Sequence, residues 1–320
     1  MPEASRHERA LIPLAFASIW LVWGSTFLAI RYAIVGIPPV LMCGLRLLAA
    51  GVALVAWARA SGARWPRGSE WRNAALVGVL LPGVGNLSVT VAEAHVPSGL
   101  VALLVSTIPL WMALLASWGP HAEPPGRRAL GGLVLGFAGI VLLIGPGLAG
   151  ARDATLSPLW ALLPVAGSLS WAWGSLWSRR ARLPASPQMS TGVGLVAGGA
   201  GALVLALARG DVTRWNVAAT PAASWAALAY LAAFGSVLGF SAYLYLLRRL
   251  APAMVATYAF VNPIVAMFLG FLFGGEALSA RTLAAAAIVL AAVLLITTAP
   301  PAPRAAGVTS GVGALPARRP

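Results

Sequence analysis

The sequence has little charge, and this scarcity excludes several classes of protein. Only 9% of its 320 residues are charged and none is lysine, whereas about 25% of the residues in a soluble globular domain are charged. A chain with so few charges cannot cover a water-facing surface, and 59% of its residues are hydrophobic. The composition therefore excludes a soluble globular protein and indicates an all-α polytopic membrane protein.

Cysteine and histidine are also scarce. The single cysteine, Cys43, lies within an apolar run, which excludes a disulfide framework and a thiolate metal cluster. His7, His95 and His121 lack the spacing of metal ligands, and no Walker motif is present. We therefore predict no metal, no cofactor and no ATPase subunit.

Arginine supplies every basic residue and gives the chain a formal net charge of +14. Such a charge can indicate nucleic-acid binding. Here the arginines form short clusters between apolar runs, which is typical of signals for membrane topology. We therefore expect a lipid bilayer around the chain and no nucleic-acid partner.

Apolar runs bounded by charge, proline or glycine predict ten transmembrane helices. About 20 residues at 1.5 Å per residue cross roughly 30 Å of hydrocarbon. The first run continues to Ile30 without a small-residue cleavage site, which predicts a retained helix rather than a signal peptide. Residues 299–320, rich in Pro, Gly and Ala, predict a disordered cytoplasmic tail. The predicted spans are residues 11–31, 39–58, 73–92, 98–118, 128–147, 158–177, 188–208, 222–246, 253–273 and 281–298.

The arginines fit these spans when the N-terminus is cytoplasmic. Sixteen arginines then lie on the inner side and five on the outer side, with Arg46 inside the second helix. Such an excess follows the positive-inside rule. We predict a multi-pass protein of the inner (cytoplasmic) membrane with both termini in the cytoplasm.

The two halves of the chain resemble each other. Trp23-Gly24-Ser25 matches Trp173-Gly174-Ser175, an offset of 150, and Pro109 later matches Pro263. Because five is an odd number, a second set of five helices enters the membrane from the opposite face. The sequence thus predicts two inverted-topology repeats, residues 11–148 and 158–298, an architecture typical of secondary transporters.

Several motifs occur in an order that resembles a known family. They include "WGSTFLAIRYAIVGIPPVLMCGLRLLAAG", "GNLSVTVAEAHVPSGLVALLVSTIPLWMALL" and "TYAFVNPIVAMFLGFLFGGEALS". Over residues 11–298 the chain resembles the EamA family of the drug/metabolite transporter (DMT) superfamily, and within it the YedA-like inner-membrane exporters. The resemblance implies a permease that exports metabolites, amino acids or drug-like compounds. It also implies an arginine in the second helix, where Arg46 lies.

The charged residues at the outer ends of helices are candidates for coupling. An arginine at membrane depth, such as Arg46, costs roughly 2.5–3.5 kcal/mol if unrelieved. Either it is a structural side chain, or it attracts a carboxylate in the cavity. Glu93 and His95 follow the third helix, and we hypothesise that Glu93 pairs with Arg46 and senses a proton or the substrate. The alternative is that both are ordinary helix-end residues, and the protein is an uncoupled facilitator. Glu276 precedes the last helix, where it favours the positive end of that helix dipole.

Other polar and aromatic residues at depth are candidates for lining a substrate cavity. Pro109 and Pro263 each remove a backbone hydrogen bond and predict helix breaks near such a site, or harmless kinks. The cavity candidates are Trp23, Ser25, Arg46, Asn86, Trp111, Trp173, Ser236, Tyr243, Tyr258 and Asn262, with packing as the alternative for the tryptophans.

We expect a permease that exports small organic solutes by alternating access. An uncoupled facilitator or an importer is the alternative, with a proton as the possible coupling ion. A membrane-embedded enzyme would need a constellation of His, Asp or Cys at one membrane face. None is present, and we predict no catalytic residues and no enzyme.

Overall fold

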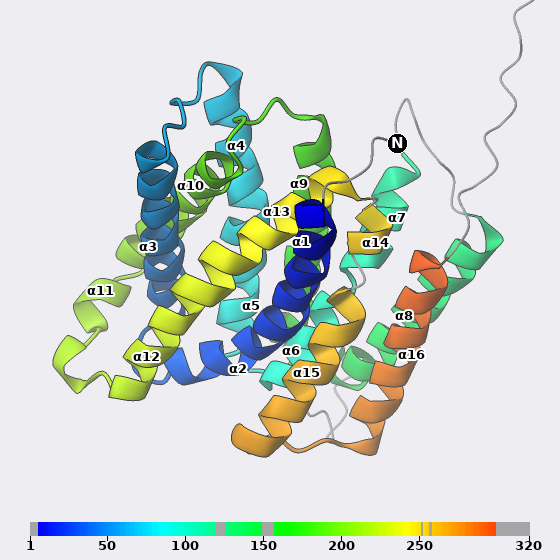
Figure 1. Cartoon of the computed structure of the whole chain (residues 1–320). Helices are drawn as coiled ribbons and strands as arrows, with labels where there is room; N and C mark the ends of the chain where they lie inside the picture. The colour runs from blue at the N-terminus through cyan, green and yellow to red at the C-terminus, as the bar shows by residue number, and fades with distance from the viewer. Residues whose placement is uncertain (1–5, 119–125, 149–156, 251, 256–257, 299–320) are drawn as a thin grey trace, which may run out of the picture.

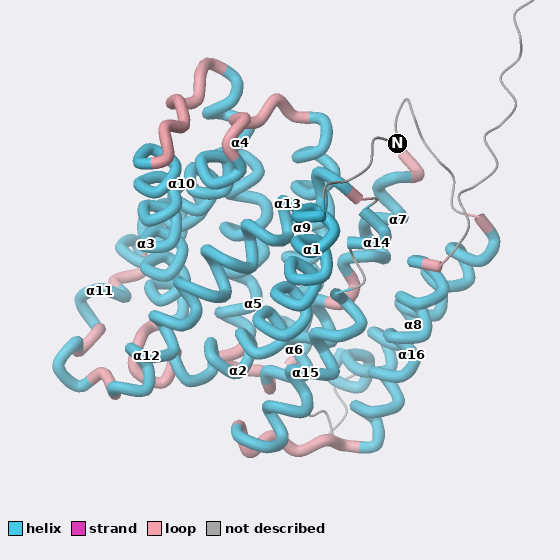
Figure 2. The backbone as a smooth tube through the Cα atoms, viewed as in Figure 1, coloured by secondary structure: helices cyan, strands magenta, loops and turns pink. Residues whose placement is uncertain are grey.

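The protein is a bundle of helices that run between two opposite ends (Figure 1). The computed structural model describes residues 6–118, 126–148, 157–250, 252–255 and 258–298. The predicted tail, residues 299–320, lies outside this range. Every regular element in the described residues is helical, as the sequence predicts, and short loops join the helices at both ends (Figure 2).

The described residues of the first half form eight α-helices and two π-helical segments. They are α1 (Arg6–Ala17), η1 (Ser18–Val22, π), α2 (Trp23–Ala33), α3 (Pro39–Ala60), α4 (Ser69–Gly78), η2 (Val79–Asn86, π), α5 (Leu87–Ala92), α6 (Ser98–Val105), α7 (Ile108–Ala116) and α8 (Arg127–Leu148).

The second half begins with two long helices and contains a third π-helical segment. Its elements are α9 (Pro158–Arg180), α10 (Pro187–Ala208), α11 (Asp211–Arg214), η3 (Val217–Ala219, 3₁₀), α12 (Ala222–Tyr230), η4 (Leu231–Leu238, π), α13 (Gly239–Arg249), α14 (Pro252–Val255), α15 (Tyr258–Phe273) and α16 (Ala280–Thr297).

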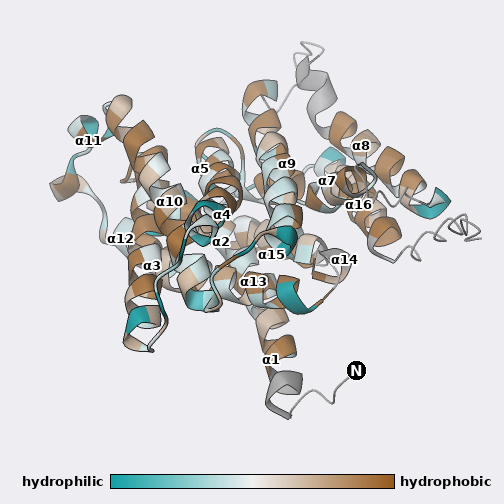
Figure 3. Ribbon diagram, turned by 90° about the horizontal axis from the view of Figure 1, so that it is seen from above, coloured by the Kyte–Doolittle hydropathy of each residue, from teal (hydrophilic) through white to brown (hydrophobic). Residues whose placement is uncertain are grey.

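Six stretches of the described chain are long and apolar enough to cross a membrane. Two shorter apolar helices, Val261–Phe273 and Ala280–Ile296, accompany them. Large apolar side chains such as Val134, Leu207 and Phe268 are exposed, and hydrophilic residues gather toward the helix ends (Figure 3). Exposure of so much apolar surface to water would be unfavourable, so these outer faces are suited to contact with lipid. The six stretches are Leu11–Ala33, Pro39–Ala60, Ser69–Ala92, Ser98–Leu115, Pro187–Ala208 and Ala222–Arg249.

Glycine allows the helices of the two halves to pack very closely. Helix α10 packs against α3, α4 and η2, while α8 packs against α16. A Cβ atom on Gly78 would lie only 2.0 Å from the Gly194 carbonyl oxygen, and one on Gly198 would lie 2.7 Å from the Gly78 carbonyl oxygen. Gly194 and Gly198 thus provide the small-residue face on which α10 contacts the α4–η2 helix.

The two prolines expected to break helices differ in effect. Helix α6 ends at Val105, and α7 begins at Ile108, immediately before Pro109. Helix α15, in contrast, continues through Pro263 from Tyr258 to Phe273. The break predicted at Pro263 is therefore wrong. Its ring removes one hydrogen bond, but the turns on either side continue the helix.

Candidate functional site

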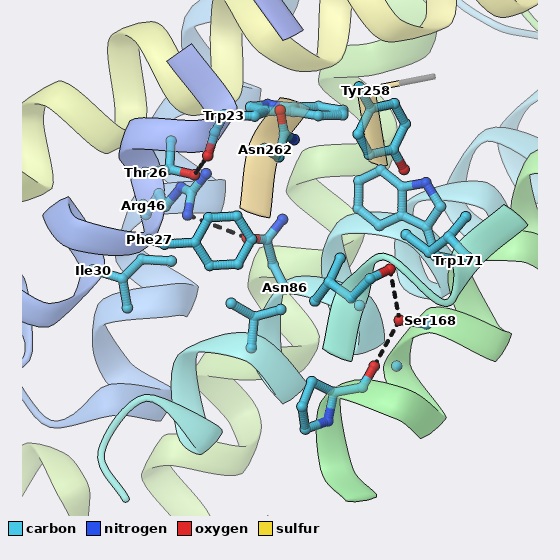
Figure 4. Close-up of a pocket in the computed structure, with 16 residues that line it drawn as sticks. Trp23, Thr26, Phe27, Ile30, Arg46, Asn86, Ser168, Trp171, Tyr258 and Asn262 are labelled. Atoms are coloured by element: carbon cyan, nitrogen blue, oxygen red, sulfur yellow. Dashed lines mark hydrogen bonds between the residues drawn. The ribbon is translucent and has the colours of Figure 1, made fainter. Parts of the chain in front are cut away.

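A cavity of about 60 Å³ lies between helices that are far apart in the sequence (Figure 4). Helices α2, α3, α5, α6 and α7 contribute to its wall together with η2, α9 and α15. It is smaller than the roughly 300–1,000 Å³ of most small-molecule sites, so a solute would enter it only as the wall opens. The lining residues are Trp23, Thr26, Phe27, Ile30, Arg46, Gly85, Asn86, Val89, Val105, Ile108, Pro164, Gly167, Ser168, Trp171, Tyr258 and Asn262.

Five aromatic side chains, which we call the aromatic cluster, form one part of this wall and the layer behind it: Trp23, Trp171, Phe240, Tyr243 and Tyr258. The Trp23 ring lies 5.4–5.6 Å, between centroids, from the other four rings. Trp23 Nε1 donates to the Gly235 carbonyl at 2.9 Å, and the Tyr243 hydroxyl is 2.8 Å from Ser175 Oγ. The cluster thus joins α2, α9, α13 and α15 through rings held in fixed orientations.

Arg46 is the buried charge of the cavity, with 2% of its surface exposed. Its Nε donates to Ser236 Oγ at 2.9 Å, and its Nη1 donates to Asn86 Oδ1 at 3.2 Å. Gly235 leaves room for the guanidinium, because a Cβ atom there would lie 2.9 Å from Nη2. Arg46 therefore connects α3 with η2 and η4.

All three π-helical segments of the described chain contact the residues of this region. Segment η1 ends immediately before Trp23, η2 ends at Asn86, and η4 contains Gly235 and Ser236. Segments of π-helix are rare and occur frequently at functional sites, because they shift side chains away from the regular helical positions. Their convergence on Arg46 and Trp23 makes this region the candidate site.

The expected ion pair between Arg46 and Glu93 is not formed. Arg46 binds Ser236 and Asn86 instead, and both carboxylate oxygens of Glu93 are buried without a hydrogen-bond partner. The reason is distance along the helix: Glu93 follows Asn86 by seven residues, which corresponds to about 10 Å of helix rise. Glu93 remains within electrostatic range of Arg46, Arg31 and Glu276.

Two further predictions near the cavity are corrected. His95 stacks on Trp160, with 3.9 Å between ring centroids, rather than joining Glu93 and Arg46 in one site. Trp173 is 58% exposed and does not line the cavity, whereas Trp171, two residues earlier, does. Two residues correspond to about 200° around a helix, so only one of these tryptophans can face inward.

The remaining candidates fall into two groups. Trp23, Arg46, Asn86, Tyr258 and Asn262 line the cavity. The other four lie outside its lining: Ser236 holds Arg46, Tyr243 belongs to the aromatic cluster, Ser25 contacts the Tyr230 hydroxyl at 2.6 Å, and Trp111 packs on Phe137.

Sequence reasoning missed several lining residues. Phe27 and Ile30 lie one and two turns beyond Trp23 on the same face of α2, and this helical spacing could have identified them. Pro164 and Ser168 lie one turn apart on α9, where Ser168 Oγ donates to the Pro164 carbonyl at 2.8 Å. The proline inside α9 was the available signal, because its ring frees a carbonyl of the helix.

Glu276 does not serve the helix that follows it. Its carboxylate accepts from Ser98 N and Ser98 Oγ, each at 2.7 Å, and from Gly99 N at 3.0 Å. Arg31 Nη1 lies 3.3 Å from its Oε1. Glu276 therefore caps α6, a helix of the other half of the chain, and the role predicted for it at its own helix is wrong.

The geometry defines a polytopic membrane protein with a cavity inside its helix bundle. The sequence model of the EamA-like transporter family matches residues 11–145 and 158–298. The chain belongs to this family, within the drug/metabolite transporter superfamily.

Two relatives match most of this chain and most of their own length. The inner membrane transporter YedA of Escherichia coli K12 is 38% identical over 275 residues, which cover 85% of this chain and 86% of YedA. Protein PecM of Dickeya dadantii is 29% identical over 82% of this chain and 84% of its own. A crystal structure of a protein with 20% identity superimposes with a TM-score of 0.63, over 90% of this chain and 98% of that one, and shares the fold.

Proposed function

We propose that the chain is a secondary transporter that exports small organic solutes across the cytoplasmic membrane by alternating access. The observation that carries the proposal is the cavity, whose wall includes Trp23 and Arg46 from the first half and Trp171 and Tyr258 from the second. Relative movement of two halves would expose such a cavity to one side of the membrane and then to the other. In this proposal the protein moves solutes and catalyses no reaction.

We further propose ten membrane-spanning helices arranged as two inverted repeats, residues 11–148 and 158–298. Two π-helical segments of eight residues support this, because they begin at residues 79 and 231, an offset of 152 that agrees with the sequence repeat. The separate family matches to residues 11–145 and 158–298 support it as well. Both termini then lie in the cytoplasm.

The aromatic cluster supports a proposal for the gate. From Ile30 to Trp23, helix α2 runs toward the end of the bundle that carries loops 61–68 and 181–186 (Figure 1). Arginines in and next to these loops are Arg59, Arg64, Arg67, Arg179, Arg180 and Arg182. By the positive-inside rule this end is cytoplasmic. The aromatic cluster would then close the cavity on the cytoplasmic side, and export would require its rings to separate.

A proton is the proposed coupling ion, and Glu93 is its proposed site. The Glu93 side chain is buried, and neither of its oxygens has a hydrogen-bond partner. Protonation would relieve the cost of burying an unpaired charge. An uncoupled facilitator would transport equally well without this carboxylate.

Flux measurements in proteoliposomes test the proposed function. The purified chain should move members of a panel of small organic solutes, and an imposed pH gradient should drive accumulation that an uncoupler abolishes. The variant Ser168→Leu fills the cavity and should reduce flux by roughly tenfold or more, because the solute loses its space. The matched control is Ala166→Leu, on the exposed face of the same helix.

Three outcomes would contradict parts of the proposal. Equal flux through the Ser168→Leu and Ala166→Leu variants would show that the cavity is not the pathway. If the solute only equilibrates across the membrane and the pH gradient has no effect, the protein is an uncoupled facilitator and proton coupling is wrong. Tags on the two ends that become labelled from opposite sides of the membrane would exclude ten spans.

A further inference from the structure

The charge of the cavity lining is unbalanced. Arg46 is the only charged residue among the sixteen described residues that line the cavity. The ion pairs found among the described residues involve other arginines, and Glu93 acts on Arg46 only from a longer distance. A buried charge without a counterion is unfavourable. The binding of a ligand with one negative charge would therefore be favourable, because the ligand would neutralise the buried guanidinium.

Arg46 also has hydrogen-bonding capacity to spare. A guanidinium carries five N–H donors, and the bonds to Ser236 and Asn86 use two of them. The remaining donors can hold a carboxylate or sulfonate through two bonds, a geometry that arginine favours. The Tyr258 hydroxyl is another buried donor of the lining, and it has no hydrogen-bond partner.

The rest of the lining limits the charge and shape of the ligand. No Asp or Glu is among the lining residues that the structure describes, so an ammonium group would find no carboxylate partner among them. One guanidinium balances one negative charge and would leave a phosphate dianion half compensated. Trp23, Phe27 and Trp171 present aromatic surface (Figure 4), which favours a flat apolar body.

We propose that the cavity selects a small organic monoanion with a flat apolar body. Arg46 binds the acidic group, with Asn86 and Ser236 fixing the guanidinium, and the aromatic wall receives the body. Arg46 is thus the residue that determines charge specificity. The inference rests on the proposed function for the transport of this anion, whereas its binding can be measured separately.

Equilibrium binding to the purified full chain, followed by tryptophan fluorescence, tests the charge preference. The probes share one apolar body and differ in charge: 3-phenylpropionate, its neutral amide 3-phenylpropanamide, the zwitterion L-phenylalanine and the cation 3-phenylpropylammonium. We expect the anion to bind at least about tenfold more tightly than each of the others, as a charge-assisted bond to a buried guanidinium implies. Equal affinity for anion and amide, or tighter binding of the zwitterion or the cation, would overturn the proposal.

Variants assign the preference to Arg46. Arg46→Gln should reduce the anion-to-amide preference to within about twofold, and Arg46→Lys should retain part of it because the charge remains. The control Arg72→Gln removes the same charge from the exposed first turns of α4 and should keep the full preference. If Arg46→Gln does not fold, the affinities of the wild type and of Arg46→Lys for the four probes still test whether Arg46 sets the charge preference. A preference that Arg46→Lys or Arg46→Gln leaves at the wild-type level would overturn the assignment.

Flux of the same probes separates this inference from the proposed function. If 3-phenylpropionate binds with the expected preference but no probe or panel solute crosses the membrane, the transport proposal fails and the anion site stands. If solutes are transported without any preference for the anion, transport stands and the anion inference fails.

Discussion

Glu276 and Glu93 are two buried carboxylates with opposite surroundings. Glu276 is 7% exposed, accepts three hydrogen bonds from Ser98 and Gly99, and pairs with Arg31. Glu93 is 3% exposed, and neither of its oxygens has a hydrogen-bond partner. The two carboxylates are close enough to interact electrostatically. Burial alone therefore does not explain their difference.

The difference separates a structural carboxylate from one that is free to change its charge. Glu276 satisfies the N-terminal N–H groups of α6 and ties the loop before α16 to that helix. An ionised Glu93 would carry the cost of burial without a hydrogen bond to offset it. A chain that retains such a group gains nothing in stability from it, which supports a role in function.

The largest effect that this comparison predicts is on stability at Glu276. Glu276→Ala should lower the free energy of unfolding by about 3 kcal/mol, because charge-assisted bonds are lost and buried N–H groups are left unpaired. Thermal and denaturant unfolding in detergent would measure it. The matched variant Glu93→Ala should lose much less. If both variants lost the same free energy of unfolding, Glu276 and Glu93 would not differ in their contribution to stability.

Glu93 should instead affect ligand binding. Glu93 lies about 10 Å of helix rise beyond Asn86, which Arg46 contacts, and its ionised form would repel an anion bound at Arg46. For a separation of about 10 Å and an effective dielectric constant of about 20, this repulsion is about 1.7 kcal/mol, or nearly twentyfold in affinity. Arg31, Arg46 and Glu276 are the charged groups that act on Glu93. Affinity for an anion should therefore rise as pH falls and Glu93 becomes protonated.

The measurement uses 3-phenylpropanesulfonate, which stays ionised throughout the titration. Wild-type affinity should increase toward low pH, and Glu93→Gln should bind at every pH as tightly as the protonated wild type. His95, which stacks on Trp160 nearby, is controlled by His95→Gln, which should keep the pH dependence. A Glu93→Gln profile that follows the wild type would rule out Glu93 as the proton site.

The helical class and the central position of several site residues could be predicted from the sequence. Low charge and long apolar runs determine the class, because a membrane protein needs apolar surface facing lipid. The sequence indicates Trp23, Asn86 and Asn262, which line the cavity. Polar side chains at membrane depth are unfavourable in lipid and therefore usually face the interior of the bundle. These inferences depend on composition and spacing, which a sequence displays directly.

Contacts between distant segments could not be predicted. The π-helical segments change which face a residue occupies, so Ser236 meets Arg46 in a way that regular helical spacing does not indicate. Glu276 contacts α6, which is 177 residues away at Gly99. For Trp171 and Trp173 the repeat alignment selected the wrong tryptophan, because aligning a tripeptide does not determine the rotation of the helix that carries it.

The smallest predicted effect tests what holds Glu276 in place. Arg31 has a side chain that is 41% exposed, whereas that of Glu276 is 4% exposed. An ion pair with one partner so exposed contributes only about 0.2–1 kcal/mol and weakens with salt. Arg31→Gln should therefore cost far less stability than Glu276→Ala, and the cost should shrink further at high ionic strength. If Arg31→Gln were as destabilising as Glu276→Ala, the ion pair with Arg31, and not the cap on α6, would be the main stabilising interaction of Glu276.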